Sequence, residues 1–327
     1  MLNLFRNNSI FAFVFLIVFT VLIRLMPFLR IIPIDLNINA PLAQFIFNWV
    51  STFEDYYFFS AVSASFLVLL QAWMVNHLVV KNTILMKDSF LPALLFVLIN
   101  SFYPQQMFLS PQLIANLFII LMFQRLCNLY ESEKPLYIVL DSGLYLGMAV
   151  LFNYDTLIYL PFILISVILM TYFNIRFILA SFFGLILPIY LLGVLFFMMD
   201  NLNDLIIIIN NSLNRNYLNS ISINWNKIIP WFLITIIVFA SGISLQLNYF
   251  KNKVKTRRIL ITLVLYIVIS VLLTLIEDHN VVFAVCYLSV PVSIIMANYF
   301  ISKKLVILKE ILFLSLVITA VIFQYFI

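Results

Sequence analysis

The stretch MPFLRIIPIDLNINAPLAQFIFNWVSTFEDYYFF, residues 26–59, joins the first two long apolar runs of the sequence. It carries Asp35, Glu54 and Asp55, whereas the predicted runs on either side, 9–29 and 58–80, hold very few charges. A run of about 17 to 25 predominantly apolar residues is long enough to cross a bilayer as a helix. The sequence therefore predicts a first membrane helix, a long polar connection and a second membrane helix.

The composition of the whole chain agrees with a membrane protein. Of its 327 residues, 65% are hydrophobic and 9% are charged, against about 45–50% and 25% in soluble domains. The net charge of +5 does not indicate nucleic-acid binding, because Lys and Arg in such a chain mark the sidedness of the loops. We expect an all-α, multi-pass protein of the bacterial inner membrane, in contact with membrane lipids and not with nucleic acid.

Apolar runs recur along the whole sequence and predict about eleven membrane helices. They cover residues 9–29, 58–80, 89–103, 112–130, 136–152, 157–174, 177–198, 229–249, 259–276, 281–301 and 305–326. The run at 9–29 is expected to stay uncleaved, because no small-residue cleavage site follows it. Residues 1–200 form one predicted membrane module with seven helices, and residues 201–327 add a long outer loop and four more helices.

Charges sort onto opposite sides of this arrangement. With the N-terminus inside and the C-terminus outside, the inner loops hold 14 of the 18 basic residues and the outer side holds eight of the 13 acids. This distribution follows the tendency of Lys and Arg to stay on the cytoplasmic side. The outer acids are Asp35, Glu54, Asp55, Asp155, Asp200, Asp204, Glu277 and Asp278.

Two outer segments predict helices that lie in the membrane interface, and the glycines predict details of helix packing. PLAQFIFNWVSTF (41–53) and LIIIINN (205–211) are too short to span and are expected to lie in the outer interface as amphipathic helices. Gly143 and Gly147 form a GxxxG pattern, which favours close helix packing. Gly184, Pro188 and Gly193 interrupt the run 177–198, where a kink is expected.

Several chemistries are excluded by residue counts and motifs. The sequence lacks GxGxxG, GxxxxGK[ST], GxSxG and HExxH patterns. His77 and His279 are the only histidines and fall on opposite predicted sides, which excludes a multi-histidine metal centre. Cys127 and Cys286 lie within apolar runs and are expected to be small buried side chains without a disulfide.

The outer acids and arginines are the candidate site residues. Asp35 can ligate Mg²⁺ or Mn²⁺ or accept a proton from a hydroxyl, and Asp278 is a second candidate metal ligand. Glu54 or Asp55 can help to bind the same metal ion. Neighbouring residues on a helix point about 100° apart, so at most one of the two faces a shared site. The simpler interpretation of these acids is a set of solvated loop residues.

Arg24 and Arg30 are candidate phosphate ligands, because a guanidinium matches the geometry of a phosphate. Arg24 lies at the end of an apolar run and is the one charge that the sequence places clearly inside the membrane. It is expected to snorkel, to pair with an acid or to meet a lipid phosphate. A single intramembrane charge makes an ion or proton transporter the weakest of the functional hypotheses.

The order of these features resembles the C-superfold integral-membrane glycosyltransferases, which use polyprenyl-phosphate sugar donors. The resemblance covers residues 1–200 and rests on Asp35, on NSFYPQQMFLSPQLIAN (100–116) and on GLYLGMAVLFNYDTLIYLP (143–161). In that superfold an acid often stands near the second outer turn, where this chain has Gln105, Gln106, Gln112 and Asn116. The chain is also similar to an uncharacterised family of bacterial polytopic membrane proteins.

Two functions from different classes follow. The resemblance implies transfer of a sugar from a polyprenyl phosphate on the outer face, with Asp35 as metal ligand or base. The second outer turn has amides where the superfold often has an acid. The absence of that acid favours a non-catalytic membrane subunit that binds protein partners in an envelope assembly. The sequence leaves both hypotheses open.

Overall fold

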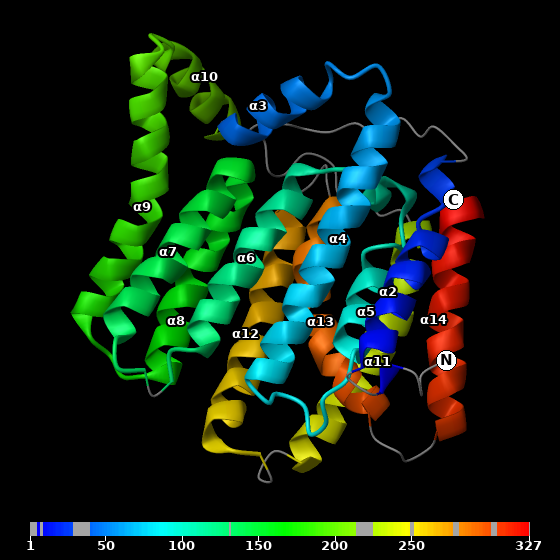
Figure 1. The fold of residues 1–327 in the computed structure, drawn as a ribbon. Helices are drawn as coiled ribbons and strands as arrows, with labels where there is room; N and C mark the ends of the chain where they lie inside the picture. The colour runs from blue at the N-terminus through cyan, green and yellow to red at the C-terminus, as the bar shows by residue number, and fades with distance from the viewer. Residues whose placement is uncertain are drawn as a thin grey trace.

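The computed structural model describes residues 5–6, 9–28, 40–130, 132–213, 225–248, 252–276, 281–301 and 306–326 (Figure 1). Over these residues the chain is all-helical and contains no β-strand, which confirms the predicted fold class. The helices of the first half are α2 (Ile10–Ile23), η1 (Met26–Phe28), α3 (Pro41–Val50), α4 (Tyr56–Lys81), α5 (Leu91–Ile99), η2 (Pro104–Met107), α6 (Pro111–Cys127) and α7 (Pro135–Phe152). Those of the second half are η3 (Tyr154–Tyr159), α8 (Leu160–Met170), α9 (Ile175–Met198), α10 (Leu202–Leu213), α11 (Trp225–Asn248), α12 (Val254–Ile276), α13 (Val281–Ile301) and α14 (Val306–Phe326).

Six of the described helices are long and apolar enough to cross a membrane: α4, α7, α9, α12, α13 and α14. Each of the other predicted apolar runs also contains a helix, namely α2, α5, α6, α8 and α11. The shortest, α5, has nine residues, and all of them are buried in the bundle. The structure thus supports a membrane-embedded bundle, while the number of eleven crossings stays a prediction.

Proline and capping residues set where many of these helices begin. Proline occupies the first or second position of α3, α5, α6, α7 and α8. These positions suit proline because the first backbone N–H groups of a helix have no partner within it. The Ser110 side chain accepts a hydrogen bond from the Leu113 N–H at 3.2 Å and caps α6 in the same way that Ser9 caps α2.

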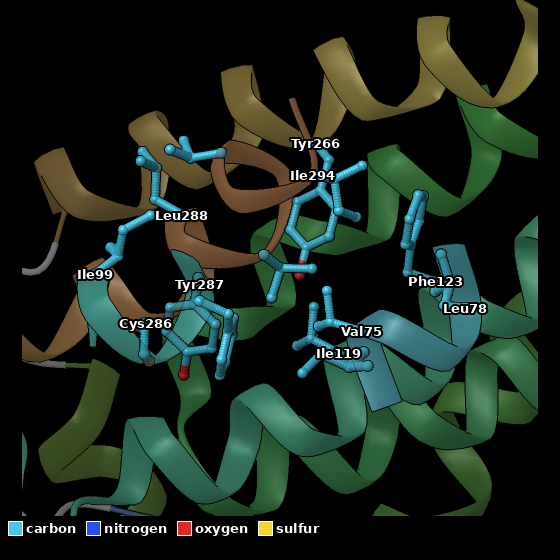
Figure 2. Packing of buried hydrophobic residues seen from close by; sticks show 14 of the residues in the cluster. Val75, Leu78, Ile99, Ile119, Phe123, Tyr266, Cys286, Tyr287, Leu288 and Ile294 are labelled. Carbon is cyan, nitrogen blue, oxygen red and sulfur yellow. The ribbon is translucent and has the colours of Figure 1, made fainter. Parts of the chain in front are cut away.

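The core of the bundle forms around α13, which packs against α5, α6, α11 and α12. In the part of α13 that is long and apolar enough to span a membrane, 83% of the residues are buried inside the bundle. Figure 2 shows Tyr287 and Ile294 of this helix among buried residues of its neighbours, including Ile119 and Tyr266. The Tyr159 hydroxyl lies 2.8 Å from Ser270 Oγ within this core, so the polar end of that ring is satisfied.

The predicted glycine contact is present between α7 and α9. A Cβ atom added to Gly143 would lie 3.1 Å from the Cα of Gly184 and would press on the backbone oxygen of Ser181. One added to Gly147 would lie 2.5 Å from the backbone oxygen of Leu185. The two helices therefore approach as closely as they do because no side chain stands between them. The helix α9 continues through Pro188, and the kink expected there stays a prediction.

Contacts between loops divide the bundle into two ends. At one end, the Phe90 N–H donates to the Phe5 oxygen at 2.9 Å, and Arg258 Nη1 donates to the Met170 oxygen at 2.9 Å. Arg258 also lies over the Tyr130 ring, 5.0 Å from its centroid. We call this the basic end; the described basic residues in or near its turns are Arg6, Lys81, Lys87, Lys134, Arg176, Lys253, Lys255, Arg257 and Arg258.

The opposite end carries acids in its turns, and we call it the acidic end. Its described acids are Glu54, Asp55, Asp155 and Asp200. The two outer segments predicted as amphipathic helices are α3 and α10, and both lie at this end (Figure 1). On α3, Ala43, Phe47 and Val50 face inward and form a small core with Leu109. The orientation in which the basic end faces the cytoplasm stays a prediction from these charges.

Candidate functional site at the acidic end of the bundle

Arg24 is buried at the acidic end, directly after the last residue of α2. Its backbone N–H donates to the Thr20 oxygen at 3.1 Å, and only 1% of the residue is exposed. Its Nη1 donates to the backbone oxygen of Asn100 at 3.3 Å and its Nη2 to that of Gln106 at 2.9 Å. The guanidinium therefore joins the end of α2 to the end of α5 and to η2.

The surroundings of Arg24 explain how a buried cation is tolerated. Asn100 follows the last residue of α5, and carbonyl groups at a helix C-terminus carry partial negative charge. Of the described carboxylates, none lies within ion-pair distance of Arg24, and its Nε has no hydrogen-bond partner there. Among the described residues, then, two backbone carbonyls take the place of the acid that the sequence suggested as a partner.

A row of buried amide side chains extends this polar region across the bundle. Asn100 Nδ2 donates to Ser289 Oγ at 2.8 Å, and Gln106 Nε2 donates to the Val282 oxygen at 2.6 Å. Both contacts lead to α13, and Gln324 on α14 donates to the Ser101 oxygen. The segment between α5 and α6 is thus a buried polar connection that fixes the acidic ends of four helices.

A second group of amides lies between α4 and α6. Gln71 Nε2 donates to the Leu113 oxygen at 2.7 Å, and Asn116 Nδ2 donates to Gln71 Oε1 at 3.1 Å. Gln112 Oε1 and Asn116 Oδ1 are buried without a partner among the described residues. Amides can orient a ligand by hydrogen bonds, but they cannot accept a proton as a carboxylate does. These side chains are therefore suited to positioning and not to general base catalysis.

Glu54 and Asp55 lie in the turn between α3 and α4, and both side chains are exposed. Asp55 is the residue before the first turn of α4, and its backbone oxygen accepts a hydrogen bond from the Phe59 N–H at 3.0 Å. Its side chain makes no capping hydrogen bond. The two carboxylates are thus accessible from outside the bundle at its acidic end.

The remaining predicted site residues, Asp35, Arg30 and Asp278, lie outside the described residues. On either side of Asp35, Met26 and Ala40 are described, and both are buried at the acidic end. Within the described part of the chain, no group of three or more His, Cys, Asp or Glu side chains could hold a metal ion. The predicted site for Mg²⁺ or Mn²⁺ therefore still rests on Asp35 and Asp278.

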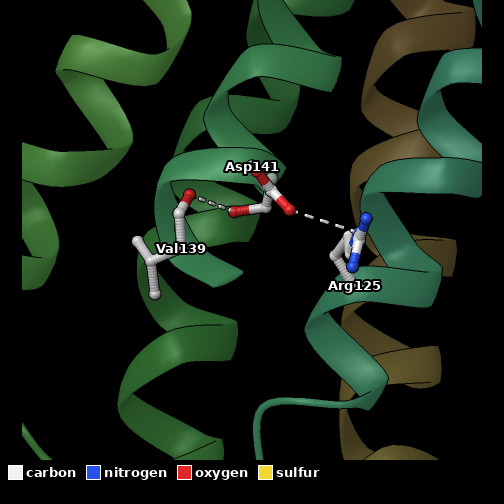
Figure 3. A network of polar contacts seen from close by, with 4 residues as sticks. Arg125, Val139 and Asp141 are labelled. Carbon is white, nitrogen blue, oxygen red and sulfur yellow. Dashed lines mark hydrogen bonds and ion pairs between the residues drawn. The ribbon is translucent and has the colours of Figure 1, made fainter. Parts of the chain in front are cut away.

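One charged pair inside the bundle was not anticipated from the sequence. Arg125 Nε lies 3.4 Å from Asp141 Oδ2, between α6 and α7 (Figure 3). Only 11% of the Asp141 side chain is exposed, against 42% for Arg125. Arg24 and Asp141 are thus both buried charges among the described residues, and the depth of either within a membrane stays a prediction. The signal was present, because Asp141 is the only acid in the apolar run 136–152.

Comparison of the chain with models of protein families, with curated proteins and with solved structures finds no match.

Proposed function

We propose that this chain is a bacterial inner-membrane protein that transfers a sugar from a polyprenyl-phosphate donor at its acidic, outer end. The observation that carries the proposal is the position of α3. This amphipathic helix lies over the acidic end, directly after the segment that contains Asp35 and directly before the exposed Glu54 and Asp55. An amphipathic helix of this kind lies at the boundary between membrane and water, where a lipid-linked donor and a water-soluble acceptor would meet.

The proposed chemistry is the attack of an acceptor hydroxyl on the anomeric carbon of the donor sugar. The new bond joins the acceptor oxygen to that carbon, and the bond from the carbon to the phosphate oxygen breaks. Asp35 takes the hydroxyl proton, and the polyprenyl phosphate leaves with the bonding electron pair. Glu54 or Asp55 assists from the adjacent turn, and a bound Mg²⁺ or Mn²⁺ would stabilise the negative charge on the leaving phosphate.

The two arginines differ in what they can contribute to phosphate binding. Each Nη group of Arg24 donates a hydrogen bond to a backbone carbonyl, and the whole side chain, including its Nε, is buried. We therefore assign Arg24 mainly to holding α2, α5 and η2 together, and Arg30 to the phosphate. A guanidinium can bind two phosphate oxygens at once, which suits this role.

The proposal is tested with purified protein in proteoliposomes that contain a polyprenyl-phosphate hexose with a radiolabelled sugar. We expect the label to move to a water-soluble acceptor supplied on the acidic side, and the transfer to stop when EDTA removes divalent cations. Asp35→Asn protein of equal abundance is the matched control. Transfer at an equal rate by Asp35→Asn would contradict the proposal.

A second function, a non-catalytic subunit of an envelope assembly, is favoured by one observation. Gln106 and Asn116 are buried amides at positions near the second outer turn, where the glycosyltransferase superfold often has an acid. Purification of the chain with stable protein partners, together with absence of transfer in the proteoliposomes, would support this function instead.

A further inference from the structure

Three aromatic rings gather where α3 turns into α4, and we call Trp49, Phe53 and Phe59 the aromatic ledge. The Phe53 and Phe59 rings are stacked, with centroids 4.8 Å apart and planes at 14°. Trp49 meets both rings edge-on, with centroid distances of 5.1 and 6.4 Å. Trp49 is 57% exposed and Phe53 is 39% exposed, so the ledge presents ring surface to its surroundings.

The ledge is held in place by the turn beneath it. Ser51 Oγ donates to the Asn48 oxygen at 2.7 Å, and Thr52 Oγ1 donates to the Trp49 oxygen at 2.6 Å. Val50, which follows Trp49, is buried and fixes the end of α3 against the bundle. A surface that is ordered before binding loses less conformational entropy when a ligand arrives.

Polar groups adjoin the rings in the sequence and in the turn. Glu54 and Asp55 follow Phe53 directly, and Asn48 precedes Trp49; all three are exposed. One face of a pyranose ring consists of C–H groups, whose partial positive charge is attracted to the negative face of an aromatic ring. The hydroxyl groups at the rim of the sugar are donors for carboxylates, and such charge-assisted hydrogen bonds are the stronger kind.

We infer that the aromatic ledge binds a sugar ring, with Trp49 as the stacking surface and Glu54 or Asp55 as hydroxyl acceptors. This inference rests on the proposed function and names the part of the site that would hold the acceptor sugar. An alternative occupant of exposed aromatic rings is the lipid interface. The exposed acids Glu54 and Asp55, which follow Phe53 in the sequence, oppose that alternative, because acids enter a bilayer at a cost and are repelled by anionic lipids.

The test uses the tryptophan emission of full-length protein in nanodiscs of phosphatidylcholine and phosphatidylglycerol. Detergents with a maltose headgroup are avoided because they would compete for the ledge. The probes are methyl glucoside, methyl mannoside and N-acetylglucosamine at millimolar concentration. We expect at least one probe to change the emission in a saturable way. The change should disappear in Trp49→Phe and remain in Trp73→Phe.

Trp73 is a suitable control because it is 51% exposed on the same helix bundle and stacks on His77 at 5.7 Å, away from the turn. Saturation-transfer NMR gives a second readout that needs no tryptophan. There we expect Trp49→Ala to weaken binding about tenfold, the upper part of the range for one aromatic contact, and Glu54→Gln with Asp55→Asn to weaken it further.

Three outcomes would overturn the inference: no response to any probe, the same response in Trp49→Phe as in the unmodified chain, or failure of iodide to quench Trp49 before sugar is added. The last outcome would place lipid over the ring. Asp35→Asn separates this inference from the proposed function. If sugar binds at Trp49 but neither the unmodified protein nor Asp35→Asn transfers it, the aromatic ledge is supported and the transferase is contradicted. If the unmodified protein transfers sugar without binding it at Trp49, the transferase is supported and the ledge is contradicted.

Discussion

Gly143 on α7 faces Gly184 on α9 so closely that a Cβ atom on Gly143 would lie 3.1 Å from the Gly184 Cα. The contact joins two helices that each qualify by length and composition as membrane spans. Because lipid tails are as apolar as the helices, close packing is what stabilises such a pair.

Gly143→Leu is expected to destabilise the protein by about 1 to 3 kcal/mol or more, since the backbone on the other side cannot move away as a side chain can. Gly193→Leu is the matched control, because a Cβ at Gly193 has no atom within 4 Å. The melting temperature in detergent and the amount of protein in the membrane should fall for the first variant only. Equal behaviour of both variants would show that the α7–α9 contact is not needed.

Arg24→Ala is expected to lower stability by about 1 to 3 kcal/mol, because the backbone oxygens of Asn100 and Gln106 lose their donor. Arg24→Lys should be intermediate, since one ammonium cannot reproduce the fork of a guanidinium. Arg176→Ala is the control, as Arg176 is exposed at the basic end. Thermal unfolding measures all three variants. An Arg24→Ala protein as stable as the control would contradict the structural role of Arg24.

The ion pair of Arg125 and Asp141 should contribute little to stability despite its position. Arg125 is 42% exposed, so solvent screens the interaction, and exposed pairs typically contribute about 0.2 to 1 kcal/mol. A double-mutant cycle with Arg125→Gln and Asp141→Asn measures the coupling directly. A coupling energy of about 3 kcal/mol or more would mean that the pair lies in a region of much lower dielectric.

The orientation of the bundle predicts which loops a reagent reaches from outside the cell. Asn211→Cys, at the end of α10, should react with a membrane-impermeant maleimide in intact cells, and Asn252→Cys, before α12, should not. The background is low because Cys127 and Cys286 are both buried. Labelling in the opposite pattern would contradict the predicted orientation of the bundle and, with it, the assignment of Asp35 to the outer face.

The sequence predicted where helices form because most of the apolar runs are long and end at polar residues, proline or both. It also predicted the glycine contact and the helix α3, since GxxxG spacing and an amphipathic pattern have direct physical meanings. The sequence could not predict the hydrogen-bond partners of Arg24. They are backbone carbonyls 76 and 82 residues away, and every residue offers such a carbonyl.

The inward faces of the helices were equally hard to predict. A membrane helix is apolar on the lipid side as well as on the packed side, so the periodicity that reveals a buried face in soluble proteins is weak. Asp141 lies within the predicted run 136–152 and received no role there, although its side chain is largely buried and pairs with Arg125. Gln71 was predicted only as part of the apolar run 58–80, and Asn116 only as an amide near the second outer turn, although the two hydrogen-bond each other across α4 and α6.

The most direct test of the proposed function is complementation of a deletion strain with Asp35→Asn. This substitution keeps the size of the side chain and removes the ionised acceptor that a base or metal ligand needs. If the chain is a transferase, the variant should reach the normal level in the membrane, keep its melting temperature and fail to restore the envelope glycans. Full restoration of the glycans by Asp35→Asn, with the same co-purifying proteins as the unmodified chain, would contradict the transferase and leave the membrane subunit as the function.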